Sequence, residues 1–205
     1  MSRVNVLLII LGVLLLGGYA AWNNFTLSNE RAAMQVRSVK TVTFPGKFAL
    51  VDHNNTKVSE KTYYGRYSLV FFGYTFCPDV CPTVLQDIST VQELLGSDAE
   101  KIAPLFISVD PERDTPAVLN DYMSNFHPSI MGLSGTPEAV KAAAKSFHVY
   151  YSKELPEGSD EDDYLMSHSG RIYLMDKQSM YLHSFEYGDT PEAMAKKLTE
   201  ILSGA

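Results

Sequence analysis

Residues 67–82 read YSLVFFGYTFCPDVCP, and this stretch largely decides the fold. Its first six residues form a nearly continuous apolar run rich in β-formers, which is typical of a central strand buried on both faces. Apolar side chains at helical spacing follow at Leu85, Ile88, Val91 and Leu95. The two cysteines of the chain, Cys77 and Cys81, lie between this strand and this helix. The stretch therefore predicts the strand–loop–helix unit of an α/β domain.

Elements of both types alternate on either side of this stretch. Residues 105–109 form a second buried-strand run, and helices are predicted at 116–126, 137–147 and 191–202. Shorter strands are predicted at 48–51, near Val58, and at 148–151, 171–175 and 181–185. Strand, helix, strand, helix, then a strand pair and a final helix is the order of a thioredoxin-like three-layer domain.

The starts of the predicted helices resemble one another. Threonine precedes proline at Pro116, Pro137 and Pro191, so that a hydroxyl caps the free amides and proline occupies the first helical position. Cys81 stands in the same place before Pro82. This comparison predicts that Cys81 occupies the N-cap position of its helix.

The N-terminal segment is apolar. Residues 4–22 contain no charged side chain, and their length is close to the roughly 20 residues of a membrane-spanning helix. Arg3 precedes the run and Trp22 ends it, which favours an anchor with a cytoplasmic N-terminus. A cleaved signal peptide is the alternative, because GYA at 18–20 resembles a cleavage site. We therefore expect a single N-terminal transmembrane helix at 1–22, a spacer at 23–43 and the folded domain at 44–205.

Composition narrows the function classes. The chain has 205 residues, of which 45% are hydrophobic and 20% charged, so it is neither disordered nor fibrous. Its net charge of −7 argues against a nucleic-acid partner, which would require a basic face. Two cysteines are too few for a disulfide-stapled miniprotein or a cysteine-rich zinc module. The apolar run is not preceded by an Arg- and Ser-rich leader, which favours the bacterial inner membrane, with the domain in the periplasm.

Cys77 and Cys81 are the main chemical signal. A helix N-terminus at the carboxyl end of a buried strand offers free amides and a positive dipole, and both favour the thiolate. Thiolates are the nucleophiles of disulfide exchange and soft ligands for Cu(I). Three residues separate the cysteines, whereas the usual oxidoreductase motif has two, so the spacing favours metal capture without excluding redox chemistry. A structural disulfide is the remaining alternative, although closing so short a loop adds little stability.

Two sulfurs leave a Cu(I) site one donor short of trigonal coordination, and histidine is the natural third ligand. His168 precedes the predicted strand 171–175, and the segment that leads into this strand faces the cysteine loop in thioredoxin-like folds. Packing or surface roles are predicted for the other histidines, His53, His127, His148 and His183. The predicted metal ligands are therefore Cys77, Cys81 and His168.

Three neighbouring features leave alternatives open. Arg113, in a charged turn after the second buried strand, could meet a thiolate or a partner, or simply belong to a turn before a capped helix. Met166 could offer a thioether to copper, although core packing is the simpler account. The acidic run at 154–163 is a solvated loop, a docking surface for a basic partner, or an arm that moves His168.

With these residues identified, the chain resembles the Sco (SenC) family over most of 44–202. The resemblance rests on GYTFCPDVCP at 73–82, SVDPERDT at 108–115 and the segment 164–174. The family consists of membrane-anchored, thioredoxin-like copper proteins required for assembly of cytochrome c oxidase, and its residues matching Cys77, Cys81 and His168 bind copper. Members commonly carry Asp before the histidine, where this chain has Ser167; the difference bears on copper affinity.

The resemblance implies a copper metallochaperone rather than an enzyme. The protein would receive one copper ion, as Cu(I) or Cu(II), from a periplasmic copper donor and deliver it to the binuclear copper A centre of cytochrome c oxidase subunit II. The alternative is a thiol–disulfide reductase, in which Cys77 and Cys81 are catalytic and keep the cysteines of that subunit reduced. A copper- or redox-sensing interaction protein and a peroxiredoxin-like peroxidase are weaker alternatives.

Overall fold

The computed structural model describes residues 16–19, 22, 43–158, 160 and 163–204. The chain divides into two units, Met1–Val42 and Thr43–Ala205, and the buried core of the described residues lies in the second unit. In the first unit residues 16–19 are helical, and most of the predicted anchor and spacer falls outside the described residues. Among the described residues, no helix has the length and apolar character needed to cross a membrane. Because Thr43–Ala205 contains its own core, it is expected to fold alone.

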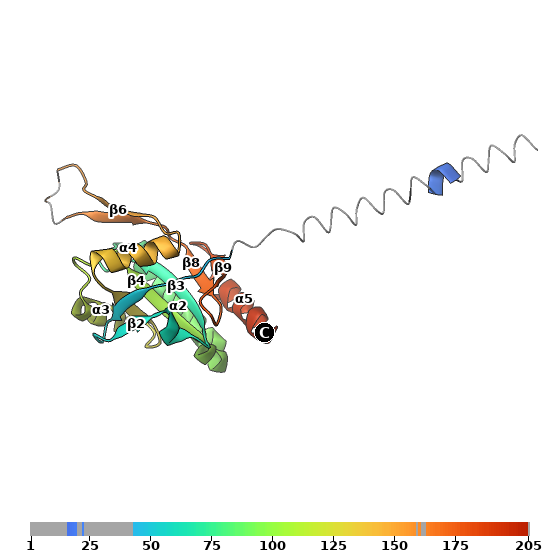
Figure 1. The fold of residues 1–205 in the computed structure, drawn as a ribbon, viewed down its shortest axis with the longest axis horizontal. Coiled ribbons are helices and arrows are strands. Elements are labelled where there is room, and N and C mark those ends of the chain that lie inside the picture. The colour runs from blue at the N-terminus through green and yellow to red at the C-terminus, as the bar shows by residue number, and fades with distance from the viewer. Residues whose placement is uncertain (1–15, 20–21, 23–42, 159, 161–162, 205) are drawn as a thin grey trace, which may run out of the picture. The chain divides into compact units, whose positions relative to one another are not determined.

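A seven-stranded sheet forms the centre of the second unit (Figure 1). Its strands, in spatial order, are β2 (Lys57–Ser59), β1 (Ala49–Asp52), β5 (Met131–Ser134), β4 (Ile102–Ser108), β3 (Tyr67–Gly73), β8 (Ile172–Met175) and β9 (Tyr181–Phe185). β3 pairs in parallel with β4 and antiparallel with β8, so that Val70 lies between Leu105 and Tyr173. Every residue of β3 and β4 is buried, as predicted for strands covered on both faces.

Helices cover both faces of this sheet. They are α2 (Val80–Leu95), α3 (Pro116–Met123), α4 (Pro137–Ser146) and α5 (Pro191–Ser203), with short 3₁₀ helices η1 (Glu60–Tyr63) and η2 (Gly96–Lys101). Successive side chains of β3 point to opposite faces. Phe72 packs against Phe147 at the end of α4, while a Cβ at Gly73 would meet both Phe71 and Cys81, so α2 begins on the Phe71 face. The result is the three-layer, thioredoxin-like arrangement that the sequence predicts.

A separate hairpin extends from the domain beside α4 (Figure 1). It consists of β6 (Tyr151–Glu154) and β7 (Leu165–His168), which pair antiparallel with Tyr151 opposite His168. The prediction of a strand at 148–151 was displaced by three residues, because His148 has a left-handed φ of 56° that interrupts extended chain. His168 was expected in a turn and instead ends a strand.

The helix starts agree with the sequence at three places and differ at the fourth. The threonine hydroxyls accept hydrogen bonds from backbone N–H groups in the first turns, at Thr115, Thr136 and Thr190. The N-cap of α2 is Asp79 rather than Cys81, and Cys81 lies in the first turn. Pro82 is compatible with this shift, since the first four N–H groups of a helix have no intrahelical acceptor.

Candidate metal centre

The cysteine loop, residues 73–81, joins the end of β3 to the first turn of α2. Cys77 is partly buried and Cys81 has no exposed surface, and the two sulfurs are not joined in a disulfide. The backbone N–H of Cys81 donates a hydrogen bond to the Cys77 sulfur at 3.3 Å. Gly73 makes room for this arrangement, because a Cβ there would lie 2.8 Å from the Cys81 sulfur. The fold therefore packs one sulfur inside the domain and leaves the other at its surface.

His168 approaches the cysteines from the end of β7. Its Nε2 lies 3.5 Å from the Cys81 sulfur, and its Nδ1 lies 3.1 Å from the carbonyl oxygen of Ser169. A carbonyl only accepts hydrogen bonds, so this contact places the proton on Nδ1 and leaves the Nε2 lone pair facing the sulfurs. The rings of Phe71 and Tyr74 lie in T-shaped arrangements with the imidazole, with centroid distances of 6.0 and 5.9 Å.

The two thiols have pKa values displaced in opposite directions. A hydrogen bond from the Cys81 thiol lowers the pKa of Cys77 well below its ordinary value, despite the opposing effect of burial. The same hydrogen bond, together with burial, raises the pKa of Cys81. The two shifts therefore favour a pair in which Cys81 keeps its proton and Cys77 is the thiolate.

The three predicted metal ligands are brought together. The sulfurs of Cys77 and Cys81 and a ring nitrogen of His168 lie within 4.8 Å of one another. Two sulfurs and one imidazole nitrogen form a soft donor set, which suits copper far better than a hard cation such as Mg²⁺. The same geometry also suits disulfide exchange, because a thiolate stands beside a second thiol.

Arg113 contacts both segments that carry the predicted metal ligands, the cysteine loop and the β6–β7 hairpin. Its Nε donates to Asp110 Oδ2 at 2.5 Å, and its Nη1 donates to the backbone carbonyl of Tyr164 at 3.0 Å. The guanidinium also stacks 3.6 Å from the centroid of the Tyr164 ring and 4.6 Å from that of Phe76 in the cysteine loop. The Tyr164 hydroxyl donates to Asp110 Oδ1 at 2.8 Å. Arg113 therefore contacts both the cysteine loop and the start of the strand that ends at His168.

A buried carboxylate secures the cysteine loop from the same side. Asp114 has no exposed surface and accepts hydrogen bonds from the Thr75 N–H, the Thr75 hydroxyl and the Ser108 hydroxyl. Burial raises the pKa of Asp114, although these three donors act in the opposite direction. The turn after β4 thus fixes Thr75, two residues before Cys77.

The remaining sequence candidates have structural roles. As predicted, the other histidines have hydrogen-bonding or packing roles. His53 and His127 form hydrogen bonds with the Gly132 N–H and the Ser129 hydroxyl. The rings of His148 and His183 pack against those of Phe44 and Phe185. Met166 packs partly buried against the core, which agrees with the packing interpretation. Sequence reasoning missed Tyr164, whose only signal was its place at the start of the 164–174 segment.

Comparison with known proteins gives consistent matches. A family model described as SCO1/SenC matches residues 37–203. The Saccharomyces cerevisiae protein named "Protein SCO2, mitochondrial" is 36% identical over 192 residues, which cover 92% of this chain and 64% of that protein. This chain thus spans just under two thirds of the length of that relative.

Solved structures agree with the sequence matches. The structure of Bradyrhizobium japonicum ScoI with copper bound is 44% identical, with a TM-score of 0.70 over 77% of this chain and 98% of that one. The crystal structure of yeast Sco1 with copper bound is 36% identical, with a TM-score of 0.72 over 79% and 90% of the two chains. The family model covers most of the chain, including both cysteines and His168, so the predicted resemblance is confirmed and the chain belongs to the SCO1/SenC family.

Proposed function

We propose that this protein is a copper metallochaperone that holds one copper ion, its cargo, through Cys77, Cys81 and His168. The observation that carries the proposal is the approach of two sulfurs and one imidazole nitrogen to within 4.8 Å of one another. Two relatives have been solved with copper bound, which supports copper as the metal. The soft donor set supports the same choice.

The three ligands contribute differently to capture and release. Cys77 is already a thiolate and partly exposed, so it is the sulfur that an incoming or departing copper ion meets first. Cys81 must lose its proton when its sulfur binds metal, so copper binding releases a proton. Ligands of an acceptor protein would displace these donors one at a time, and copper would never become a free aqua ion.

The acceptor that we propose is the binuclear copper A centre of cytochrome c oxidase subunit II, with loading by a periplasmic copper donor. Membership of the SCO1/SenC family supports this role. Residues 1–22 would anchor the protein in a bacterial inner membrane, 23–43 would act as a spacer, and 44–205 would stand in the periplasm. The uncharged run at 4–22 supports the anchor.

A thiol–disulfide reductase is the second candidate, favoured by the two free thiols and the ionised Cys77. Cys77 would attack a disulfide of the acceptor and form a mixed disulfide, which releases one acceptor thiolate. Cys81, after losing its proton to solvent, would attack Cys77 and release the second thiolate. Two electrons pass to the acceptor, whose two thiolates take up protons, while Cys77 and Cys81 become a disulfide.

Mixing the copper-loaded unit Thr43–Ala205 with the apo copper A domain of subunit II distinguishes the two candidates. A chaperone moves copper to the acceptor and leaves the total number of thiols unchanged. A reductase instead raises the thiol count of an oxidised acceptor, and His168→Ala spares that activity while it reduces copper transfer. If neither copper nor thiols change, both proposals are wrong.

A further inference from the structure

Residues 44–48, which we call the entry strap, lead from the predicted spacer into β1. On one side the strap meets the turn between β8 and β9. The Gly46 N–H donates to the Ser179 carbonyl at 2.8 Å, and the Ser179 hydroxyl donates to the Gly46 carbonyl at 2.9 Å. The Tyr181 N–H donates to the Phe44 carbonyl at 2.9 Å. These three hydrogen bonds attach the strap to the edge of the sheet before β1 begins.

On its other side the entry strap packs on the end of α4. The Lys47 N–H donates to the Ser146 hydroxyl at 2.7 Å, and this hydroxyl donates to the Pro45 carbonyl at 2.8 Å. A Cβ at Gly46 would lie 2.6 Å from the Phe147 ring, so glycine allows the strap to approach the helix end this closely. The strap therefore holds the last turn of α4 against the β8–β9 turn.

The chain that leads to His168 starts from this helix end. His148 has a left-handed φ of 56°, and its N–H donates to the Lys145 carbonyl at 3.2 Å. The next N–H, that of Val149, donates to the Ala144 carbonyl at 2.8 Å. These two bonds form a Schellman motif, in which glycine usually occupies the left-handed position. A histidine there has a Cβ, so its conformation carries a cost that surrounding contacts must offset.

Phe44 provides such a contact. Its ring meets the His148 ring in a T-shaped arrangement, with a centroid distance of 4.8 Å. The other side of the contact is Tyr181, the first residue of β9, whose ring is stacked with that of Phe44 at 4.8 Å. Phe44 thus joins the central sheet to the residue at which the chain leaves α4.

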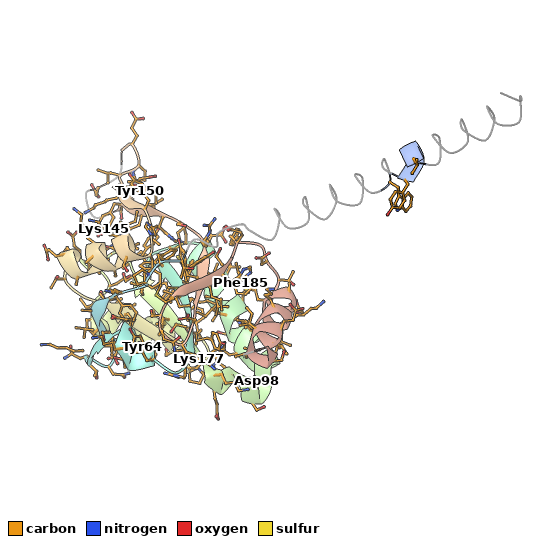
Figure 2. The ribbon with its side chains drawn as sticks, turned by 45° about the vertical axis from the view of Figure 1, so that its right-hand side comes forward. Tyr64, Asp98, Lys145, Tyr150, Lys177 and Phe185 are labelled. Carbon is orange, nitrogen blue, oxygen red and sulfur yellow. The ribbon has the colours of Figure 1, made fainter. Side chains whose placement is uncertain are left out.

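Only two residues separate His148 from the hairpin sheet. Tyr151, the first residue of β6, is the cross-strand partner of His168. Figure 2 shows Lys145 on α4 and Tyr150 just before β6 at the same end of the domain. The direction in which the chain leaves α4 therefore sets the position of Tyr151, and through it that of His168.

We propose that Phe44 is a positioning residue for His168, because it holds the left-handed turn at His148 and so fixes the root of the β6–β7 hairpin. The predicted spacer, residues 23–43, ends immediately before Phe44. The point at which the tether joins the domain is thus also the point that orients the third metal ligand. The consequence for copper rests on the proposed function, whereas the position of His168 in the metal-free domain does not.

Hydrogen exchange and NMR of the reduced, metal-free unit Thr43–Ala205 test this role. In Phe44→Ala the amides of β6 and β7 should exchange at least about fivefold faster, since the hairpin opens locally with less free energy. The ring signals of His168 should shift or broaden. Phe44→Tyr, which keeps the ring, should restore the parent behaviour.

The matched control is Ile201→Ala, which removes a partly buried apolar side chain near the end of α5. Amides of the buried strand β3 report global unfolding, and their rates correct for any general loss of stability in either variant. After this correction the hairpin should exchange faster in Phe44→Ala alone. Equal hairpin rates in Phe44→Ala and Ile201→Ala, or unchanged His168 signals in Phe44→Ala, would overturn the proposal.

A double-mutant cycle connects the strap to copper. Competition with a chromogenic Cu(I) chelator should show about three- to tenfold weaker binding in Phe44→Ala, a coupling of ordinary size for a residue that does not touch the ligand. In a His168→Ala background the same change should have no further effect, because the imidazole it positions is gone. A loss that persists in that background contradicts the proposal. A parent protein that binds no copper contradicts the proposed function, and the exchange rates and ring signals then decide the positioning role alone.

Discussion

The cysteine loop and the β6–β7 hairpin supply the ligands of one site, but the fold supports them very differently. Cys81 is fully buried against β3, a central strand of a seven-stranded sheet. His168 ends a strand of a two-stranded sheet in which alternate residues, such as Leu165 and Ser167, are exposed. A two-stranded hairpin is marginally stable by itself. The comparison indicates a fixed pair of sulfurs and an adjustable imidazole.

The largest loss of copper affinity should come from replacing Cys81 in the cysteine loop, the fixed half of the site. Loss of a residue that only supports a metal ligand costs about 10–100-fold in affinity, so loss of the ligand Cys81 should cost more than about a hundredfold. We expect His168→Ala to cost less than Cys81→Ala, about 10–100-fold, because two sulfurs remain to hold Cu(I). Competition with a chromogenic Cu(I) chelator measures both, with His183→Ala as the control. Equal losses in the two variants would remove the distinction between a fixed and an adjustable half.

Much of the fixed half could be predicted from the sequence. The apolar runs of β3 and β4 and the Thr-Pro helix starts are local patterns, and each produced the expected element. The cysteine pair is local as well, which is why its position at the end of a strand was evident. Cys81 was misplaced by two helical positions, because proline fits several places in a first turn.

The adjustable half was harder to predict. β6 and β7 are short and carry few apolar residues, so their alternation is too brief to distinguish strand from loop. The hydrogen bond from Arg113 to Tyr164 joins residues 51 positions apart. No local sequence pattern around either residue predicts this contact. His168 was identified through its expected place in a thioredoxin-like fold, and its hydrogen bond to Ser169 was beyond what the sequence indicated.

The second prediction concerns how the shifted pKa values of Cys77 and Cys81 make the stability of the fold depend on pH. The pKa of Cys77 is lowered in the folded state, so its thiolate stabilises the fold above the unfolded thiol pKa, and this contribution is lost as the pH falls towards the folded value. The raised pKa of Cys81 acts in the opposite sense: it stabilises the fold below the unfolded pKa, and the contribution is lost as the pH rises towards the folded value. Between these limits the pair keeps one proton.

Alkylation measures this asymmetry directly. In the reduced, metal-free protein at pH 6, iodoacetamide should modify Cys77 at least about tenfold faster than a thiol with an ordinary pKa, since the thiolate is the reactive form. Cys81 should remain unmodified on the same timescale, because it is buried and protonated. Peptide mass spectrometry assigns the label, with Cys77→Ser as the control that should lose the fast reaction. Labelling of Cys81 first would contradict the pKa assignment.

A third, smaller loss of copper affinity should follow from weakening the Arg113 contacts that join the cysteine loop to the hairpin. Arg113→Lys keeps the charge but removes the fork that contacts both Asp110 and Tyr164, so the hairpin should move more freely relative to the cysteine loop. We expect copper affinity to fall by about tenfold, the lower end of the range for residues that orient a ligand. The His168 ring signals in NMR should broaden, a change that a loss of stability alone would not produce. Arg66→Lys is the control, and unchanged copper affinity in Arg113→Lys would show that the hairpin is positioned without this link.

The smallest effect is expected at the residue where the chain departs from the usual family pattern. Ser167 is exposed and lies opposite Ser152 in the hairpin, and strand alternation turns its side chain away from the face of His168. Nδ1 of His168 already has an acceptor in the Ser169 carbonyl, so an added carboxylate would have no vacant role in orienting the ring. We therefore expect Ser167→Asp to change copper affinity by less than about threefold, and a solvent-screened charge effect of this size should vanish at high salt. Ser152→Asp, which adds the same charge on the neighbouring strand, should behave alike. A tenfold gain specific to Ser167→Asp would mean that the carboxylate replaces the carbonyl as the partner of the imidazole, and that the adjustable half of the site is tuned by the residue beside its ligand.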